Sequence, residues 1–144
     1  MGFPDRIERV IELDRPPAEV WPALTTAEGL SAWFSDEVTI DLRPGGAAQM
    51  TWNESHAPVM RVERIEPTSV FGFSWPVDGS TEDAVPRTYV EFTLEPLNGG
   101  TGTRLTLVES GFAQLPDSTY GPTYTGHAEG WVRELDELVA YLAA

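Results

Sequence analysis

About half of this 144-residue chain, from Val38 onward, alternates apolar and polar residues with a period of two. Successive side chains of a strand point to opposite faces of its sheet, so this alternation predicts strands with one apolar face. The clearest run is Arg87–Glu95. The pattern predicts about six strands, at 38–42, 48–52, 59–66, 69–75, 87–95 and 103–110. A long antiparallel sheet with one apolar face must be covered by another element, and this is the main constraint on the fold.

The end of the chain supplies one helix that can cover the sheet. Between His127 and Leu142, apolar residues at helical spacing form one stripe, made of Trp131, Leu135, Leu138 and Leu142. The preceding segment, 111–125, carries Gly, Pro, Ser and Thr together with two tyrosines. We expect an ordered loop there, followed by a single long helix.

The start of the chain predicts one further strand. Arg6–Leu13 alternates apolar and charged residues, with Val10 as the exception. Pro17–Leu24 then follows with helical spacing, and its first proline suits the start of a helix. Because Pro22 removes a hydrogen bond inside that helix, we expect the helix to be short or kinked.

A second short helix is predicted directly afterwards. Thr25 or Thr26 can cap it, and Leu30, Trp33 and Phe34 fall on one apolar stripe. The element order is therefore a strand, two short helices, about six strands and a long helix. We expect one domain spanning residues 1–144.

The charge balance excludes several classes of partner. The chain carries 23 acidic residues against nine arginines and no lysine, which gives a formal net charge of −14. Such a field repels phosphate backbones and acidic lipids, so we expect no nucleic-acid partner. No apolar run approaches the ~20 residues of a membrane span, so we expect no membrane insertion.

The content of cysteine and histidine limits the chemistry. There is no cysteine, which excludes disulfides, thiolate metal sites and cysteine nucleophiles, and suits a reducing compartment. Two histidines are too few for a histidine-rich metal centre. We expect a soluble, cytoplasmic protein without a metal site or a cofactor.

Three local patterns resemble a known superfamily. PPAEVWPALTTAEGLSAWF, RLTLVESGF and GWVRELDELVAYL occur in the order and spacing of the helix-grip (SRPBCC) superfamily, which includes START lipid-transfer domains and polyketide cyclases. The likeness spans Ile7 to Leu142 and is closest to the bacterial family homologous to the activator of the heat-shock protein 90 ATPase. Two residues depart from the pattern: Pro22 interrupts the first short helix, and Glu109 stands where such sequences commonly carry a histidine.

The resemblance implies a START-like α+β fold. In this fold a curved antiparallel sheet wraps around the long C-terminal helix, with two short helices after the first strand and an apolar cavity between sheet and helix. Members of the superfamily bind or transform hydrophobic small molecules. The resemblance does not indicate which molecule.

Aromatic residues are the main candidates for a binding site. Aromatic walls with few polar groups are typical of apolar ligand sites, and each buried indole N–H needs a partner. If the sheet curls around the last helix, Trp33 and Phe34 lie at the cavity mouth and pack partly on that helix and partly on a guest. The predicted ligand-binding residues are Trp33, Phe34, Met50, Trp52, Phe73, Trp75, Phe92, Phe112, His127 and Trp131. For each of them the alternative is an ordinary core position.

The candidates for acid–base chemistry are His127 and a buried carboxylate. His127 lies four residues before Trp131, on the same side of the predicted helix and near its start, where the helix dipole favours a neutral imidazole. The alternative is a capping or solvated histidine. Ser110 lacks the surroundings of a nucleophile elbow, so no catalytic residue is assigned.

These observations leave three functions open. We favour a binding domain for a small hydrophobic or aromatic molecule over a cyclase- or hydrolase-type enzyme that uses the same cavity. The third hypothesis is a chaperone-activator-like module that binds a protein. The sequence leaves open whether the chain forms a homodimer.

Overall fold

A computed structural model describes residues 5–35, 37–51, 59–76 and 86–143. Its helices and strands follow one another in the predicted order. They are β1 (Arg6–Leu13), α1 (Pro17–Thr25), α2 (Ala27–Trp33), β2 (Glu37–Ile40), β3 (Ala47–Thr51), β4 (Val59–Glu66), β5 (Val70–Pro76), β6 (Arg87–Leu97), β7 (Gly102–Ser110) and α3 (Asp117–Ala143). Two short 3₁₀ turns, η1 (Asn98–Gly100) and η2 (Phe112–Gln114), precede β7 and α3.

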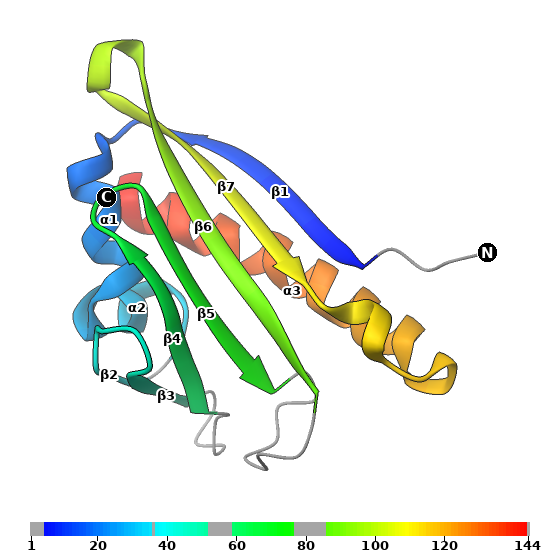
Figure 1. Ribbon diagram of the computed structural model, residues 1–144. Coiled ribbons are helices and arrows are strands. Elements are labelled where there is room, and N and C mark those ends of the chain that lie inside the picture. Colours follow the sequence, from blue (N-terminus) through cyan, green and yellow to red (C-terminus); the bar gives the residue numbers. More distant parts are fainter. Residues whose placement is uncertain (1–4, 36, 52–58, 77–85, 144) are drawn as a thin grey trace.

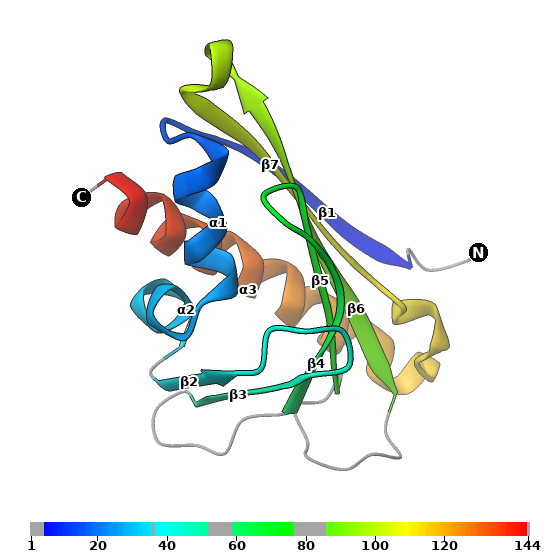
Figure 2. The same ribbon diagram turned by 60° about the vertical axis from the view of Figure 1, so that its left-hand side comes forward.

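The seven strands form one antiparallel sheet in the order β1-β7-β6-β5-β4-β3-β2. The sheet is curved, and the helices lie on its concave side, with α3 crossing it and α1 and α2 covering one end (Figures 1 and 2). This arrangement is the predicted α+β helix-grip fold. Within the described ranges, no helix is long and apolar enough to cross a membrane.

The predicted alternation places the expected side chains in the core. Val90, Phe92 and Leu94 of β6 are buried, while the residues between them are partly exposed. The stripe of α3 meets this face with Leu135 and Leu138. Removing each such side chain from water stabilises the fold by about 1.5–3 kcal/mol.

The predicted loop at 111–125 is wrong in its second half, because α3 begins at Asp117 rather than near His127. The carbonyl of Pro116 accepts hydrogen bonds from the amides of Thr119 and Tyr120, which starts the helix. Tyr120 stacks on Tyr124 one turn later, with ring centroids 5.5 Å apart. The segment is helical although it contains Gly121 and Pro122, and this stacking supports its first turns.

The two short helices are held together by a close approach of their backbones. Thr26 caps α2, as predicted, because its hydroxyl oxygen accepts a hydrogen bond from the amide of Gly29 at 2.9 Å. Any Cβ on Gly29 would lie 2.2 Å from the carbonyl oxygen of Pro22, so only glycine permits this packing. The contact holds the first turn of α2 against α1, and Trp33 and Phe34 at the other end of α2 are buried.

Candidate functional site

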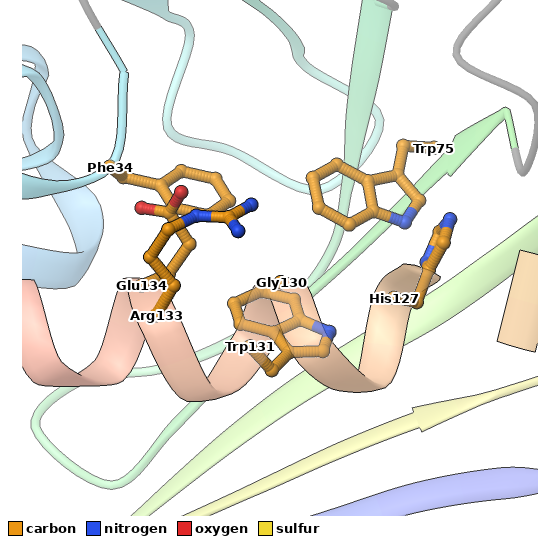
Figure 3. Close-up of a pocket in the computed structure, with 7 residues that line it drawn as sticks. All are labelled: Phe34, Trp75, His127, Gly130, Trp131, Arg133 and Glu134. Carbon is orange, nitrogen blue, oxygen red and sulfur yellow. The ribbon is translucent and has the colours of Figure 1, made fainter. Parts of the chain in front are cut away.

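A hollow of about 550 Å³ opens beside the middle of α3. Phe34 reaches it from the end of α2 and Trp75 from β5, and the other lining residues belong to α3 (Figure 3). The full lining is Phe34, Trp75, His127, Gly130, Trp131, Arg133 and Glu134. The hollow is therefore built where sheet, short helix and long helix meet.

Three of the lining rings lie nearly parallel to one another. The planes of Phe34 and Trp131 differ by 8°, with ring centroids 5.6 Å apart. Trp75 lies 6.0 Å from Phe34 and 5.8 Å from Trp131, at angles of 18° and 26°. The three rings support one another by stacking, and they give the hollow a wall suited to a flat apolar molecule.

The carboxylate of Glu109 lies behind this wall and is fully buried. It accepts hydrogen bonds from the indole N–H of Trp131 at 2.8 Å and of Trp75 at 3.0 Å. The hydroxyl of Thr88 donates to it at 2.6 Å, and Nδ1 of His127 lies 2.9 Å from both of its oxygens. Four donors from β5, β6 and α3 thus meet at one side chain of β7.

This network determines the charge of Glu109. Burial alone would raise the pKa of its carboxyl group, but the hydrogen bond and positive charge of His127, with the hydrogen bonds of Thr88 and Trp75, hold the pKa below its ordinary value. Glu109 is therefore an anion at neutral pH. Among the described residues, every buried side-chain nitrogen and oxygen has a hydrogen-bond partner.

The rim of the hollow carries charge of both signs. Arg133 and Glu134 lie on the α3 side of the lining. Burial raises the pKa of Glu134 and the charge of Glu137 adds to the effect, while Arg133 opposes it. Glu134 is thus the carboxyl group that lines the hollow, and its pKa is shifted in the direction opposite to that of Glu109.

The structure brings four of the predicted site residues to the hollow and places others behind it. Phe34, Trp75, His127 and Trp131 line it. Phe73, Phe92 and Phe112 are buried and make edge contacts with Trp75, Trp131 and His127 respectively, so they support the lining from the core side. Trp52 and the side chain of Met50 lie outside the described part of the chain.

Trp33 and Phe34 were both predicted to lie at the cavity mouth, but only Phe34 lines the hollow. The indole of Trp33 donates to the carbonyl of Ala23 at 2.7 Å and packs on Phe34, away from the hollow. Phe34 stacks on Trp131 of α3 and also faces the hollow. The pair thus anchors α2 with one ring and contributes to the site with the other.

The expected position of His127 at a helix start is wrong, because α3 begins ten residues earlier. Its environment is set by Glu109, which the sequence marked only as a departure from the superfamily pattern. The sequence feature that points to Glu109 is the alternation of inward and outward residues along β7. Leu105, Leu107 and Glu109 fall on the same inward face. An acidic residue on an apolar face needs partners, and such residues are often functional.

The fold and the site define the class of protein to which the chain belongs. A curved antiparallel sheet around a long C-terminal helix, with a partly aromatic hollow between them, is the helix-grip architecture. Residues 14–143 match the family model described as Activator of Hsp90 ATPase homolog 1-like protein, and the chain belongs to this family. No curated protein matches the chain.

Solved structures share the fold across nearly the whole chain. A protein of Mesorhizobium loti, MLL2253, is 24% identical with a TM-score of 0.77, over 95% of this chain and 97% of that one. PFC0360w of Plasmodium falciparum, an HSP90 activator, is 17% identical with a TM-score of 0.81, over 97% of both chains. The Aha1 dimer of Colwellia psychrerythraea is 20% identical with a TM-score of 0.76, over 95% of both chains. At these identities the likeness concerns the fold alone.

Proposed function

We propose that the protein binds a small, flat hydrophobic or aromatic molecule in the hollow beside α3. The observation that carries this proposal is the set of three nearly parallel rings, Phe34, Trp75 and Trp131, which line one space of about 550 Å³. Sites for small molecules commonly measure roughly 300–1,000 Å³ and combine apolar walls with a few fixed polar groups. The volume and the lining both fit this class.

The rings are fixed before any guest arrives. Glu109 accepts hydrogen bonds from both lining indoles, so their orientations are determined by the protein. A guest that stacks on them need not order these side chains, and that entropy cost is removed from the binding free energy. The buried carboxylate thus supports binding without touching the guest.

The protein-interaction hypothesis receives less support from the described surface. Its large exposed apolar side chains are distributed over β1, the segment after β2, and α3: Val10, Leu42, Val132, Val139 and Tyr141. A docking surface needs a contiguous apolar patch of several hundred Å². A homodimer or a protein partner remains compatible with the family and its dimeric structural neighbour. On the basis of the cysteine-free composition we also propose a cytoplasmic location.

Calorimetry with naphthol tests the binding proposal. We expect naphthol to bind the wild-type protein and to bind Trp75→Leu about tenfold more weakly, because one stacking ring is lost, which is worth about 1.4 kcal/mol with its buried area. Trp21→Leu is the matched control, since Trp21 is a partly buried indole that contacts Phe71 and does not line the hollow. Equal weakening in both variants, or no binding to the wild type, would contradict the proposal.

Native mass spectrometry of gently purified protein is a second test. A retained small molecule in the wild type that is absent from Trp75→Leu supports the hollow as its site. The same spectra report the mass of the assembly and so separate a monomer from a homodimer. Retention of the molecule by both proteins would place its site elsewhere.

A further inference from the structure

We propose that the guest of the hollow is an elongated molecule, whose flat ring stacks on the aromatic wall and whose arm, ending in an amine, lies in a second hollow between α2 and α3. This inference rests on the proposed binding function, because the ring uses the same site. It adds a second subsite and the chemical class of the group that occupies it. Two observations carry it: the two hollows share part of their lining, and the polar atoms of the second one are mostly acceptors.

The second hollow measures about 280 Å³ and adjoins the first. Phe34, Arg133 and Glu134 line both of them. Arg133 and Glu134 lie at the Phe34 end of the first hollow, and His127 lies at its other end (Figure 3). The rest of the second lining comes from α2, the segment after it and α3: Ser31, Ala32, Trp33, Ser35 and Glu137. A guest that extends from the ring wall past Phe34 therefore enters the second hollow.

The two hollows follow one side of α3. Four α3 residues of the two linings succeed one another at steps of three, four and three along the helix: His127, Gly130, Glu134 and Glu137. Residues at such steps lie on the same face of a helix. From the first to the last of them the helix rises by roughly 15 Å, which is about three turns. A ring that carries an arm fits this length better than a compact guest does.

The second hollow offers hydrogen-bond acceptors rather than donors. The hydroxyl of Ser31 donates to the carbonyl of Glu28 at 3.0 Å. The hydroxyl of Ser35 donates to the carbonyl of Glu37 at 3.2 Å. Both hydroxyl protons are therefore in use, and the indole N–H of Trp33 is bound inside the core. Towards a guest the two hydroxyl oxygens can only accept, as can the ionised carboxylates of the lining.

The charges of the second hollow favour a cation. Glu134 and Glu137 contribute two carboxylates, against one guanidinium from Arg133. Burial and then the charge of Glu137 raise the pKa of Glu134, so the two carboxylates repel each other. An ammonium group brings three donors, no acceptor and one positive charge, and it would relieve this repulsion. The net charge of −14 attracts such a guest from a distance.

The rival occupant is an arm that ends in a carboxylate. Of the described side chains in this lining, Arg133 alone has donors to spare, and a carboxylate arm would use them. Such an arm would also lie beside Glu134 and Glu137, so three carboxylates would share one guanidinium. An amine is therefore favoured, and the carboxylate arm belongs in the test.

Three derivatives of naphthol that differ only at the end of the arm test the charge. Naphthyloxypropylamine ends in an ammonium group, naphthyloxypropanol in a hydroxyl and naphthyloxypropionate in a carboxylate. We expect calorimetry at neutral pH to show that the amine binds about tenfold more tightly than the alcohol, because its hydrogen bonds to carboxylates are charged. Equal affinities of the amine and the alcohol, or tighter binding of the carboxylate, would overturn the inference.

Glu137 provides a test of the second hollow alone, because it does not line the first. Glu137→Gln should weaken binding of the amine about fivefold, the effect of one exposed ion pair, and leave binding of naphthol unchanged. Asp136→Asn is the matched control, since it removes the same charge from the next residue of α3, which lines neither hollow. Equal weakening by both variants, or none by Glu137→Gln, would overturn the inference.

Ala32→Leu tests the place of the arm. Ala32 lines only the second hollow and is exposed, so a larger side chain there fills the hollow without entering the core. This variant should reduce the affinity for the amine to about that for naphthol, and its affinity for naphthol should be unchanged. Ala140→Leu is the control, because Ala140 is exposed on α3 outside both linings. Full affinity of Ala32→Leu for the amine would overturn the subsite.

Naphthol itself separates this inference from the proposed function. If the wild-type protein binds naphthol and the amine arm adds no affinity, the second subsite is refuted and the binding function stands. If the wild type binds neither naphthol nor its derivatives, both are refuted. Tighter binding of the amine that disappears in Ala32→Leu, weakens in Glu137→Gln and persists in both controls would establish the subsite.

Discussion

Replacing Glu109 by Gln would test the central role of this residue, because the change removes its charge while nearly keeping its shape. One carboxylate oxygen accepts from Trp131 and His127, and the other accepts from Trp75, Thr88 and His127. In the variant one of these oxygens becomes an NH₂ group, which cannot accept a hydrogen bond. If the oxygen that faces Trp131 is replaced, the buried indole N–H of Trp131 loses its acceptor. If the other oxygen is replaced, the indole N–H of Trp75 keeps only the hydroxyl of Thr88, at 3.1 Å.

The magnitude follows from these contacts. A buried donor left without an acceptor costs about 1–3 kcal/mol, and the remaining hydrogen bonds lose the strengthening that a charge gives them. We expect the free energy of unfolding at neutral pH to fall by about 2–4 kcal/mol. For a chain of this length, this corresponds to a decrease in Tm of about 6–12 °C.

The pH dependence of the effect identifies its cause. The pKa of Glu109 is lower in the folded protein than in the unfolded chain, so its stabilising contribution is present above the unfolded pKa and is lost as pH falls through the folded pKa. The difference between wild type and Glu109→Gln should therefore shrink as the pH falls through the folded pKa of Glu109. Urea denaturation at several pH values measures it.

Glu95→Gln provides the control, since Glu95 is exposed on the neighbouring strand β6 and should change stability by no more than about 0.5 kcal/mol. Two results would refute the reasoning. One is equal stability of Glu109→Gln and the wild type at neutral pH. The other is a difference that grows as the pH falls through the folded pKa of Glu109.

Three further predictions concern the elements that position the site. Gly29→Ala should destabilise the fold by about 1–3 kcal/mol because its Cβ meets backbone atoms of α1, whereas Gly121→Ala, in open space on α3, should stabilise it by up to about 1 kcal/mol; equal effects in urea denaturation would contradict this. Thr26→Ala should cost about 1 kcal/mol through loss of the α2 cap, and no loss in the urea midpoint would refute it. Leu138→Ala should cost about 2–5 kcal/mol because the side chain is fully buried, and a smaller loss by the same assay would show that the core collapses around the gap.

Much of the fold is predictable because the sheet has one buried face. Where a strand packs inward on one side only, its sequence must alternate, and the strands from β4 to β7 follow the predicted ranges closely. The first ten residues of α3 were not predictable from composition. There Gly121 and Pro122 indicate a break, whereas contacts of Tyr124 with Phe112 and with the carbonyl of Arg6 hold the segment helical. Such contacts join residues far apart in the chain, and no local pattern reports them.

The site was predictable in its apolar part and less so in its polar part. Phe34, Trp75 and Trp131 could be identified because aromatic residues at inward positions must lie in the core or border a cavity. The partner of the two indoles could not be assigned, since Glu109 lies 34 residues from Trp75 and 22 from Trp131. The sequence establishes only that an acidic residue occupies an inward position of β7.

The chemistry of the donors explains why a carboxylate occupies position 109. Two indole N–H groups, one hydroxyl and one imidazole N–H converge on a point from which water is excluded. A carboxylate offers about four acceptor positions and no donor, whereas a histidine offers one acceptor at most and an amide brings two donors of its own. Only an acidic side chain satisfies the whole set, so Trp75 and Trp131 require Glu109 as much as Glu109 requires them. Because these contacts are shared, a substitution at one of the three residues already removes interactions of the other two. The three residues therefore act on stability and on the ring wall as a single unit.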